Sequence, residues 1–155
     1  TGNIQLVAKW EIHTYTVLFT EGVASQEVEY GQYAIEPTAP TKEGYTFISW
    51  LFNGVVFDFN TPITGNIELV ASWEIVSYTI TYQLDGGMNH ENNPLVYNID
   101  TETIVLSEPS KEGYDFLGWY NGETRVENIE RGTTGGILGK QKSLKLLKGQ
   151  QETSL

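Results

Sequence analysis

The chain is organised around one stretch, KEGYTFISW at residues 42–50, which returns almost unchanged as KEGYDFLGW at residues 111–119. Lys-Glu-Gly is typical of a turn, because glycine reaches positive φ without steric cost. The aromatic run that follows is typical of a strand. Alternation would put Phe47 on one face and both Ile48 and Trp50 on the other, so we expect this strand to be packed on both faces, at least at its Trp end. The sequence therefore predicts one core strand that is present twice.

The duplication extends well beyond this strand. TGNIQLVAKWEIHTYTV (1–17) matches TGNIELVASWEIVSYTI (64–80) at an offset of 63, whereas the two KEGY strands are 69 residues apart. The six additional residues fall in DGGMNHENNP (85–94), and surface hairpins tolerate such insertions. Internal repeats of this kind favour two small units over one larger domain. We expect the last strand of a preceding repeat at 1–12, a first unit at 13–75, a second unit at 76–135 and a basic tail at 136–155.

Short alternating segments predict the strands within each unit. We expect strands near 15–19, 27–30, 45–50 and 67–73, with counterparts near 78–84, 95–98 and 114–119. An Asn-Gly hairpin signal follows each core strand, at 53–54 and at 121–122. Helical periodicity is not evident, apart from a short turn near 32–36. The predicted fold class is mainly β, or α+β at most.

Composition excludes several classes of function. The chain has no cysteine, which removes disulfides, Cys-bound metals and thiol catalysis. Its net charge of −11 disfavours nucleic acids and anionic lipids as partners, because phosphate binding needs a basic surface. Residues 1–135 carry −14 of charge and the tail is basic. No apolar run approaches the roughly 20 residues of a membrane span.

Three motifs together carry a family resemblance: YTITYQLDGG (78–87), PSKEGYDFLGW (109–119) and FDFNTPITGNIELVASW (57–73). They resemble the Listeria–Bacteroides repeat, the internalin B-type B repeat of bacterial surface proteins. The resemblance covers residues 1–135. It implies tandem small β-grasp, ubiquitin-like units along a secreted or wall-attached chain, with a role in adhesion or interaction and no catalysis.

The second unit departs from this pattern after Thr134. A copy of IELVASW (67–73) should follow, but the chain reads GILGKQKS (136–143), and the closing Trp is absent. We therefore expect the last strand of the second unit to be divergent or missing. For the tail we favour disorder or a short helix, which could rest on a membrane surface. The final TSL (153–155) also fits the loose pattern of peptides captured at a sheet edge.

The inserted loop offers weak candidates for a metal site. Asp85, Asn89 and Glu91 supply the oxygen ligands that Ca²⁺ prefers, but their spacing does not match an EF-hand. His13 and His90 occupy non-equivalent positions in the two copies, and neither has the convergent partners that a catalytic or zinc site needs. We expect an elongated hairpin, surface histidines, no metal and no cofactor.

The four tryptophans allow two interpretations. Exposed Trp side chains on an acidic β module could form a platform for carbohydrate. Trp10, Trp50, Trp73 and Trp119 nevertheless lie at repeat-equivalent positions beside aliphatic residues, and units this small need large side chains for their cores. We therefore expect these residues to be buried.

These observations predict a non-catalytic repeat module of a bacterial cell-surface or secreted protein, located outside the cell. It would act as a stalk or spacer and as an adhesive protein-interaction module, a monomer within a longer repeat chain. The expected partner is a host or cell-surface protein, with a wall polymer or glycan as the other choice, and an exposed sheet edge is where it would dock. The alternative is a carbohydrate-binding accessory module of a larger secreted enzyme.

Overall fold

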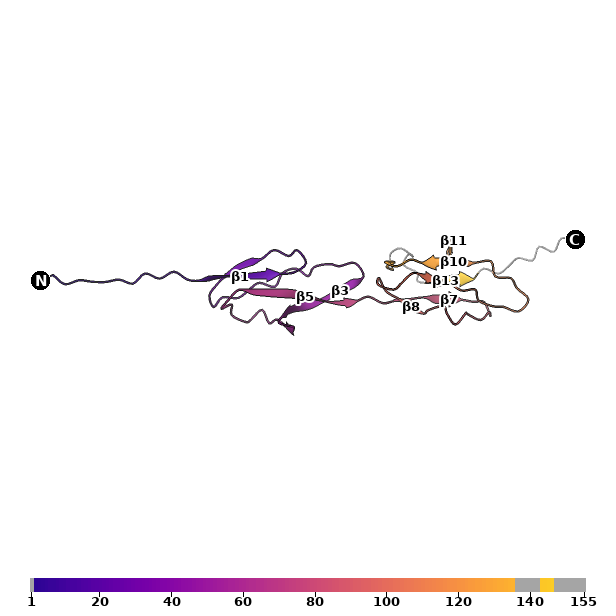
Figure 1. Ribbon diagram of the computed structural model, residues 1–155, viewed down its shortest axis with the longest axis horizontal. Helices are drawn as coiled ribbons and strands as arrows, with labels where there is room; N and C mark the ends of the chain where they lie inside the picture. The colour runs from indigo at the N-terminus through magenta and orange to yellow at the C-terminus, as the bar shows by residue number, and fades with distance from the viewer. Residues whose placement is uncertain (1, 136–142, 147–155) are drawn as a thin grey trace. The chain divides into compact units, whose positions relative to one another are not determined.

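The computed structural model describes residues 2–135 and, for the backbone alone, 143–146 (Figure 1). The chain is mainly β, as predicted, and the described residues contain no helix. They form two compact units. The first is built from the chain up to Lys42 together with Thr46–Glu74, and the second from Glu43–Tyr45 and the chain from Ile75 onwards.

The first unit is one five-stranded mixed sheet. Its strands are β1 (Thr14–Phe19), β2 (Gln26–Glu29), β3 (Tyr45–Phe52), β4 (Val55–Val56) and β5 (Ile67–Ile75). They lie in the order β2-β1-β5-β3-β4, with β1 parallel to β5 and antiparallel to β2. A β-grasp unit also carries a helix across one face of its sheet, so the β-grasp assignment stays a prediction.

Aromatic side chains fill the core of this unit, as its small size requires. Trp50 is 2% exposed, and its ring lies 5.0 Å from that of Phe19. The ring of Phe47 lies 5.4 Å from Trp50 and 5.7 Å from Trp73. Val17 and Leu69, on the two central strands, are fully buried among them.

Our expectation that the core strand is packed on both faces is wrong. Phe47 and Trp50 contact the same core although they are three residues apart, and Ile48 between them is half exposed. The strand therefore does not alternate strictly between these positions. Leu18 and Val70 are likewise about half exposed, because no described element packs on that outer face of the sheet.

The second unit repeats this plan with shorter strands. They are β6 (Tyr78–Thr79), β7 (Thr81–Gln83), β8 (Val96–Tyr97), β9 (Ile104–Val105), β10 (Trp119–Asn121), β11 (Thr124–Val126), β12 (Asn128–Ile129) and β13 (Ser143–Leu146). Four of them form a sheet in the order β11-β10-β13-β7, while β6 pairs with β8 and β9 with β12. The core contains Ile80, Tyr97, Leu106, Trp119 and Ile129.

The tail supplies the closing strand of this second sheet. β13 is parallel to β7 and antiparallel to β10, and so holds the place that β5 has between β1 and β3. At Ser143–Leu146 our expectation of disorder or a short helix is therefore wrong. A strand forms there because β7 and β10 would otherwise leave backbone groups unpaired along their shared edges. Residues 136–142 and 147–155, including the TSL ending, lie outside the described residues.

The second core strand is much shorter than predicted. In the first unit β3 begins at Tyr45, but in the second unit residues 114–118 form no strand and β10 begins only at Trp119. Pairing with β13 is limited to Trp119 opposite Leu146 and Tyr120 opposite Lys145. Among the described residues, the aromatic stretch before Trp119 has no ladder partner, and it forms no strand.

The second hairpin turn also differs from our prediction. In the first unit the turn is Asn53-Gly54, both at positive φ. In the second, Asn121 belongs to β10 and pairs with Thr124, so Gly122 and the residue after it form the turn. Gly122, at φ +63°, takes the first turn position that requires positive φ.

Residues 2–12 form no strand, although they nearly repeat the sequence of β5 (Figure 1). Trp10 is 92% exposed, so the expectation that all four tryptophans are buried is wrong for this one. The physical reason is that β5 obtains its burial from β1 and β3, and no described strand flanks residues 2–12. Within the described ranges, no helix is long and apolar enough to cross a membrane.

Candidate binding surfaces

The two edges of the first sheet differ in how open they are. At β2 the Gln26 side chain donates to the Ile35 carbonyl at 2.6 Å and accepts from the Ile35 amide at 2.8 Å. The edge strand also carries Glu27 and Glu29, both exposed. Charges and side-chain cover of this kind discourage the pairing of a further strand. The β2 edge is therefore protected.

The β4 edge is apolar. Val55 is 70% exposed and Val56 is 65% exposed, and no described strand lies beyond them in the sheet. β4 pairs with β3 through Leu51 opposite Val56 and Phe52 opposite Val55. Its outer side presents backbone groups next to apolar side chains, which is the arrangement that accepts an added strand.

The second unit has the same hairpin with different chemistry. Thr124 and Arg125 of β11 stand at the register positions of Val55 and Val56, because Asn121 pairs with Thr124 and Tyr120 with Arg125. The side chain of Arg125 forms an ion pair with Glu127 at 3.6 Å. The apolar edge is therefore a property of the first unit.

The inserted loop of the second unit begins with a tight turn. Asp85 (φ +48°) and Gly86 (φ +86°) make the turn, and the Gly87 amide donates to the Leu84 carbonyl at 2.8 Å. Asp-Gly is a favoured pair for this geometry. Met88 and Ser110 then exchange two backbone hydrogen bonds of 2.7 and 2.9 Å, which attach the loop to the segment before the KEGY turn.

Asn93 fixes the far part of this loop. It is 5% exposed, and its Nδ2 donates to Asn89 Oδ1 at 2.8 Å and to the Ser107 carbonyl at 2.9 Å. Its Oδ1 accepts from the Ser107 amide at 2.7 Å. Nothing in the sequence indicates this role, because Asn93 is one polar residue among several in a polar loop.

Tyr82 holds the end of the loop against the core. Its hydroxyl donates to the Pro94 carbonyl at 2.9 Å, and its ring lies 5.1 Å from that of Trp119. Burial raises the pKa of the Tyr82 hydroxyl to about 12. The neutral, hydrogen-bonded form is therefore the one that the folded unit stabilises.

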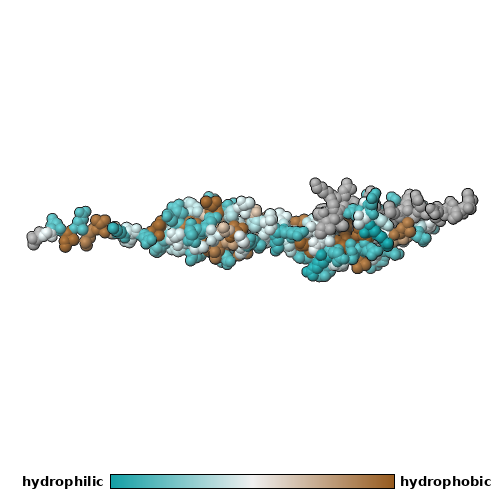
Figure 2. Space-filling view, turned by 90° about the horizontal axis from the view of Figure 1, so that it is seen from above, coloured by the Kyte–Doolittle hydropathy of each residue, from teal (hydrophilic) through white to brown (hydrophobic). Residues whose placement is uncertain are grey.

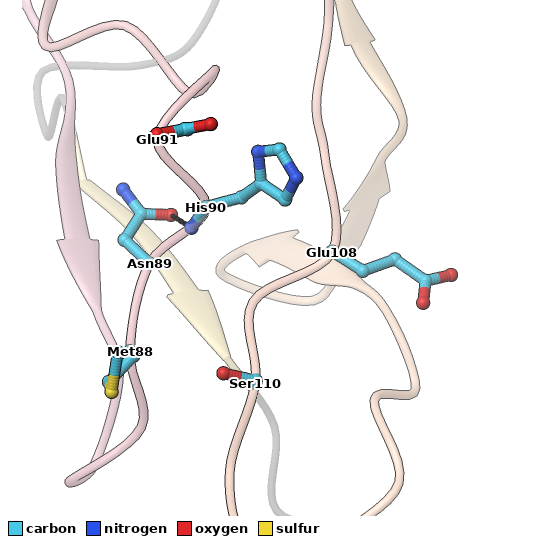
Figure 3. A pocket seen from close by; sticks show the side chains of 6 residues that line it. All are labelled: Met88, Asn89, His90, Glu91, Glu108 and Ser110. Atoms are coloured by element: carbon cyan, nitrogen blue, oxygen red, sulfur yellow. Dashed lines mark hydrogen bonds between the residues drawn. The ribbon is translucent and has the colours of Figure 1, made fainter.

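A hollow of about 380 Å³ opens between the loop and the segment that faces it (Figure 3). It is lined by Met88, Asn89, His90, Glu91, Glu108 and Ser110. The carboxylates of Glu91 and Glu108 come from opposite walls and do not converge (Figure 3). His90 Nδ1 accepts from the Asn92 amide at 3.1 Å, which places the proton of a neutral ring on Nε2.

The three metal candidates are not brought together. Asn89 and Glu91 line the hollow, whereas Asp85 lies at the turn, where its carbonyl accepts from Lys111 Nζ at 2.6 Å. Asn89 Oδ1 already accepts from the His90 amide and from Asn93. In the part of the chain that the structure describes, no group of three or more His, Asp or Glu side chains could hold a metal ion.

The tryptophans and His13 form no aromatic platform for carbohydrate on either of the described sheets. Trp50 and Trp119 are each 2% exposed, and the Trp119 indole donates to the Ser107 carbonyl at 3.0 Å. Trp73 is partly buried against the first core. The exposed Trp10 belongs to the unpaired segment 2–12, and the exposed His13 makes an edge contact with Tyr15.

Comparison with known proteins identifies the repeat. The model of the Listeria-Bacteroides repeat domain matches residues 15–72 and again residues 78–138. These two matches cover most of the chain, and they fall on the two copies that the internal duplication defines.

Three relatives are similar over most of the chain. A protein of Evansella cellulosilytica named "Putative membrane protein" is 40% identical over 136 residues, and a second protein of that organism is 36% identical over 136 residues. Internalin H of Listeria monocytogenes is 38% identical over 117 residues. These alignments cover 82%, 82% and 71% of the chain, but only 20%, 15% and 21% of the respective relatives.

Proposed function

The chain belongs to the Listeria–Bacteroides repeat family, and from that premise we propose that it serves as a spacer and adhesive protein-interaction module on the outside of a bacterium. Repeats of this family occur in bacterial surface proteins such as internalins. The small share of each relative that the chain spans supports a role as one part of a longer surface protein.

The apolar β4 edge is the observation that carries the adhesive part of this proposal. Val55 and Val56 are largely exposed on a strand that ends the sheet, whereas the opposite edge is protected by Gln26 and two glutamates. An extended segment of a partner protein can add to such an edge, with main-chain hydrogen bonds giving affinity and the valines giving apolar contact.

Repetition supports the spacer role. Two units of one family follow each other in the chain, and each has its own core. Weak contacts made by successive units add up to a stronger attachment when a surface presents several copies of the partner. The excess of acidic residues keeps such a chain soluble and discourages contact between neighbouring chains.

The experiment exchanges the edge of the first unit for that of the second. V55T/V56R gives β4 the residues that stand at the equivalent register positions of β11. We expect the unaltered chain, immobilised on beads, to bind the surface of cultured mammalian cells and the V55T/V56R variant to lose at least about 1.4 kcal/mol, tenfold, of affinity. E27Q/E29Q on the protected edge is the control and should bind unchanged.

Two results would contradict the proposal in different ways. If the unaltered chain does not bind cells, the adhesive role fails and the spacer role remains. If V55T/V56R binds as well as the unaltered chain, the docking site is not the β4 edge. Circular dichroism of each variant checks that the sheet is retained.

A further inference from the structure

We propose that β8, at an edge of the second unit, is a separate docking site for a short, basic, extended segment of a partner protein. The site belongs to the other unit and to a different strand position than the β4 edge. It does not rest on the adhesive role proposed for that edge, and it gives the chain a second place to hold a partner.

β8 stands in the second unit where the protected edge strand β2 stands in the first. In the first unit Tyr15 pairs with Val28 of β2. Tyr78, which is the copy of Tyr15, pairs in the same antiparallel way with Tyr97 of β8. Val28 and Tyr97 are both buried, each in the core of its own unit. The two edge strands are therefore equivalent, with Tyr97 in the place of Val28.

The features that protect β2 are absent from β8. Leu95 and Val96 stand at the register positions of Gln26 and Glu27, and they are 64% and 60% exposed. Gln26 covers its edge through two hydrogen bonds to the backbone of Ile35, and a Leu side chain can form neither of them. The hairpin edge is thus apolar in the first unit, whereas the edge of the β2 type is apolar in the second.

The backbone of β8 leaves one residue for a new strand. The Ile80 amide donates to the Leu95 carbonyl at 2.7 Å. In an antiparallel ladder with this register, Leu95 and Tyr97 direct their backbone groups towards residues 78–80, and Val96 directs its own away from them. No described strand pairs with β8 on that side. An added strand can therefore form two hydrogen bonds, with the amide and the carbonyl of Val96.

Both ends of this edge are closed, which limits the length of the partner segment. Pro94 has no amide hydrogen, and its carbonyl accepts from the Tyr82 hydroxyl at 2.9 Å. At the other end the Asn98 amide donates to Thr101 Oγ1 at 2.9 Å, and the Asn98 carbonyl accepts from the Thr101 amide at 3.1 Å. The edge fits a short extended segment whose apolar side chains lie against those of β8.

The charge of the second unit favours a basic partner. Residues 76–135 contain three Lys or Arg and ten Asp or Glu, a net charge of −7. Hydrophilic side chains cover much of this unit on the face that Figure 2 shows. Glu91 and Asp100, both exposed, flank β8 in the chain. Lys or Arg on either side of an apolar segment matches these charges, whereas a second copy of this acidic chain does not.

The test is an NMR titration of the full ¹⁵N-labelled chain with two synthetic peptides at low salt. The basic peptide KTVTVTK should shift the amide signals of Val96 and Tyr97, and the acidic peptide ETVTVTE should bind at least tenfold more weakly. High salt should weaken the binding of the basic peptide, because salt screens the charges.

Two double variants separate the β8 edge from general effects of composition. L95Q/V96E gives β8 the residues of β2, and we expect it to bind KTVTVTK at least tenfold more weakly than the unaltered chain does. V105E/L117Q makes the same two kinds of substitution at exposed positions outside β8, and it should bind as the unaltered chain does. Circular dichroism of both variants checks that the strands are retained.

The β4 and β8 edges are tested separately, because each has its own amide signals. The V55T/V56R chain should keep the shifts at Val96 whether or not β4 is a docking site. Absence of shifts at Val96, equal binding of the two peptides, or equal binding by L95Q/V96E and the unaltered chain would each overturn the proposal. Shifts of the Val96 amide that appear without peptide as the chain is concentrated would also overturn it, because a second copy would then be the occupant.

Discussion

Replacing Asn93 by Ala should unfold the second unit at a distinctly lower temperature and leave the first unit unchanged. The Asn93 amide is buried and makes three hydrogen bonds, two of them to the backbone of Ser107. Ala keeps the backbone of the loop but removes all three. The Ser107 amide then loses its acceptor, while the Ser107 carbonyl keeps one donor, the Trp119 indole.

The size of the effect follows from these contacts. A hydrogen bond contributes about 1 kcal/mol net, so three of them amount to roughly 3 kcal/mol. Water can replace the bond to Asn89, which is only partly buried, and this lowers the expected loss to about 2 kcal/mol. For a unit of this size such a loss corresponds to a fall in Tm of on the order of 10 °C.

Thermal unfolding followed by ¹H–¹⁵N NMR separates the two units, because the buried indoles of Trp50 and Trp119 report one core each. Asn92→Ala, at the exposed neighbouring position, is the matched control and should change Tm by no more than about 2 °C. Asn93→Asp keeps the acceptor for the Ser107 amide, but it turns a carboxylate oxygen towards Asn89 Oδ1 and the Ser107 carbonyl oxygen. Near neutral pH it should therefore destabilise the second unit at least as much as Asn93→Ala does. A loss below about 0.5 kcal/mol for Asn93→Ala would refute the role given to this side chain.

Two further predictions concern the aromatic residues. Trp50→Ala should cost the first unit about 3–5 kcal/mol by opening a cavity, whereas Trp10→Ala should stay within about 0.5 kcal/mol at low protein concentration; calorimetry of the two variants checks both. Burial raises the pKa of Tyr82 to about 12, so the folded unit holds this proton more tightly than the unfolded chain does. The stabilisation of the folded unit that comes from this raised pKa is complete below a pH of about 10 and is lost as the pH rises towards 12. The expected loss is about 1 kcal/mol, a value that already allows for the partial exposure of Tyr82. Urea unfolding at two alkaline pH values should show this loss in the unaltered chain and a smaller one in Tyr82→Phe.

The sequence predicted the parts of the fold that depend on local pattern. Alternating apolar residues located β1, β2 and β5 to within two residues at either end. The duplication located β6, β7 and β8 of the second unit but not its closing strand, β13. Trp50 and Trp119 are buried as expected. Two small cores need large side chains, and these two tryptophans lie at equivalent positions of the two repeats. These features need only the residues themselves and their spacing.

The parts that the sequence could not predict depend on partners far away in the chain. The role of Asn93 requires Ser107 to lie beside it, and neither residue stands out in a polar segment. The chemistry of the β4 edge depends on which strand ends the sheet and on the exposure of Val55, and alternation alone does not give either. Sheet order and side-chain cover appear only when the long-range pairings are known.

The two copies of the KEGY stretch show how far a strand depends on its neighbour. Their sequences are nearly the same, yet the first forms an eight-residue strand and the second a three-residue one. Within the described ranges, the main difference between the units is the closing strand, with nine residues in β5 and four in β13. Strand length here is thus set by the ladder partner more than by the propensity of the residues. It follows that a longer partner should extend β10 back towards Tyr114. Hydrogen exchange of the amides of residues 114–118, with and without a synthetic peptide that has the sequence of β5 (67–75), measures that directly.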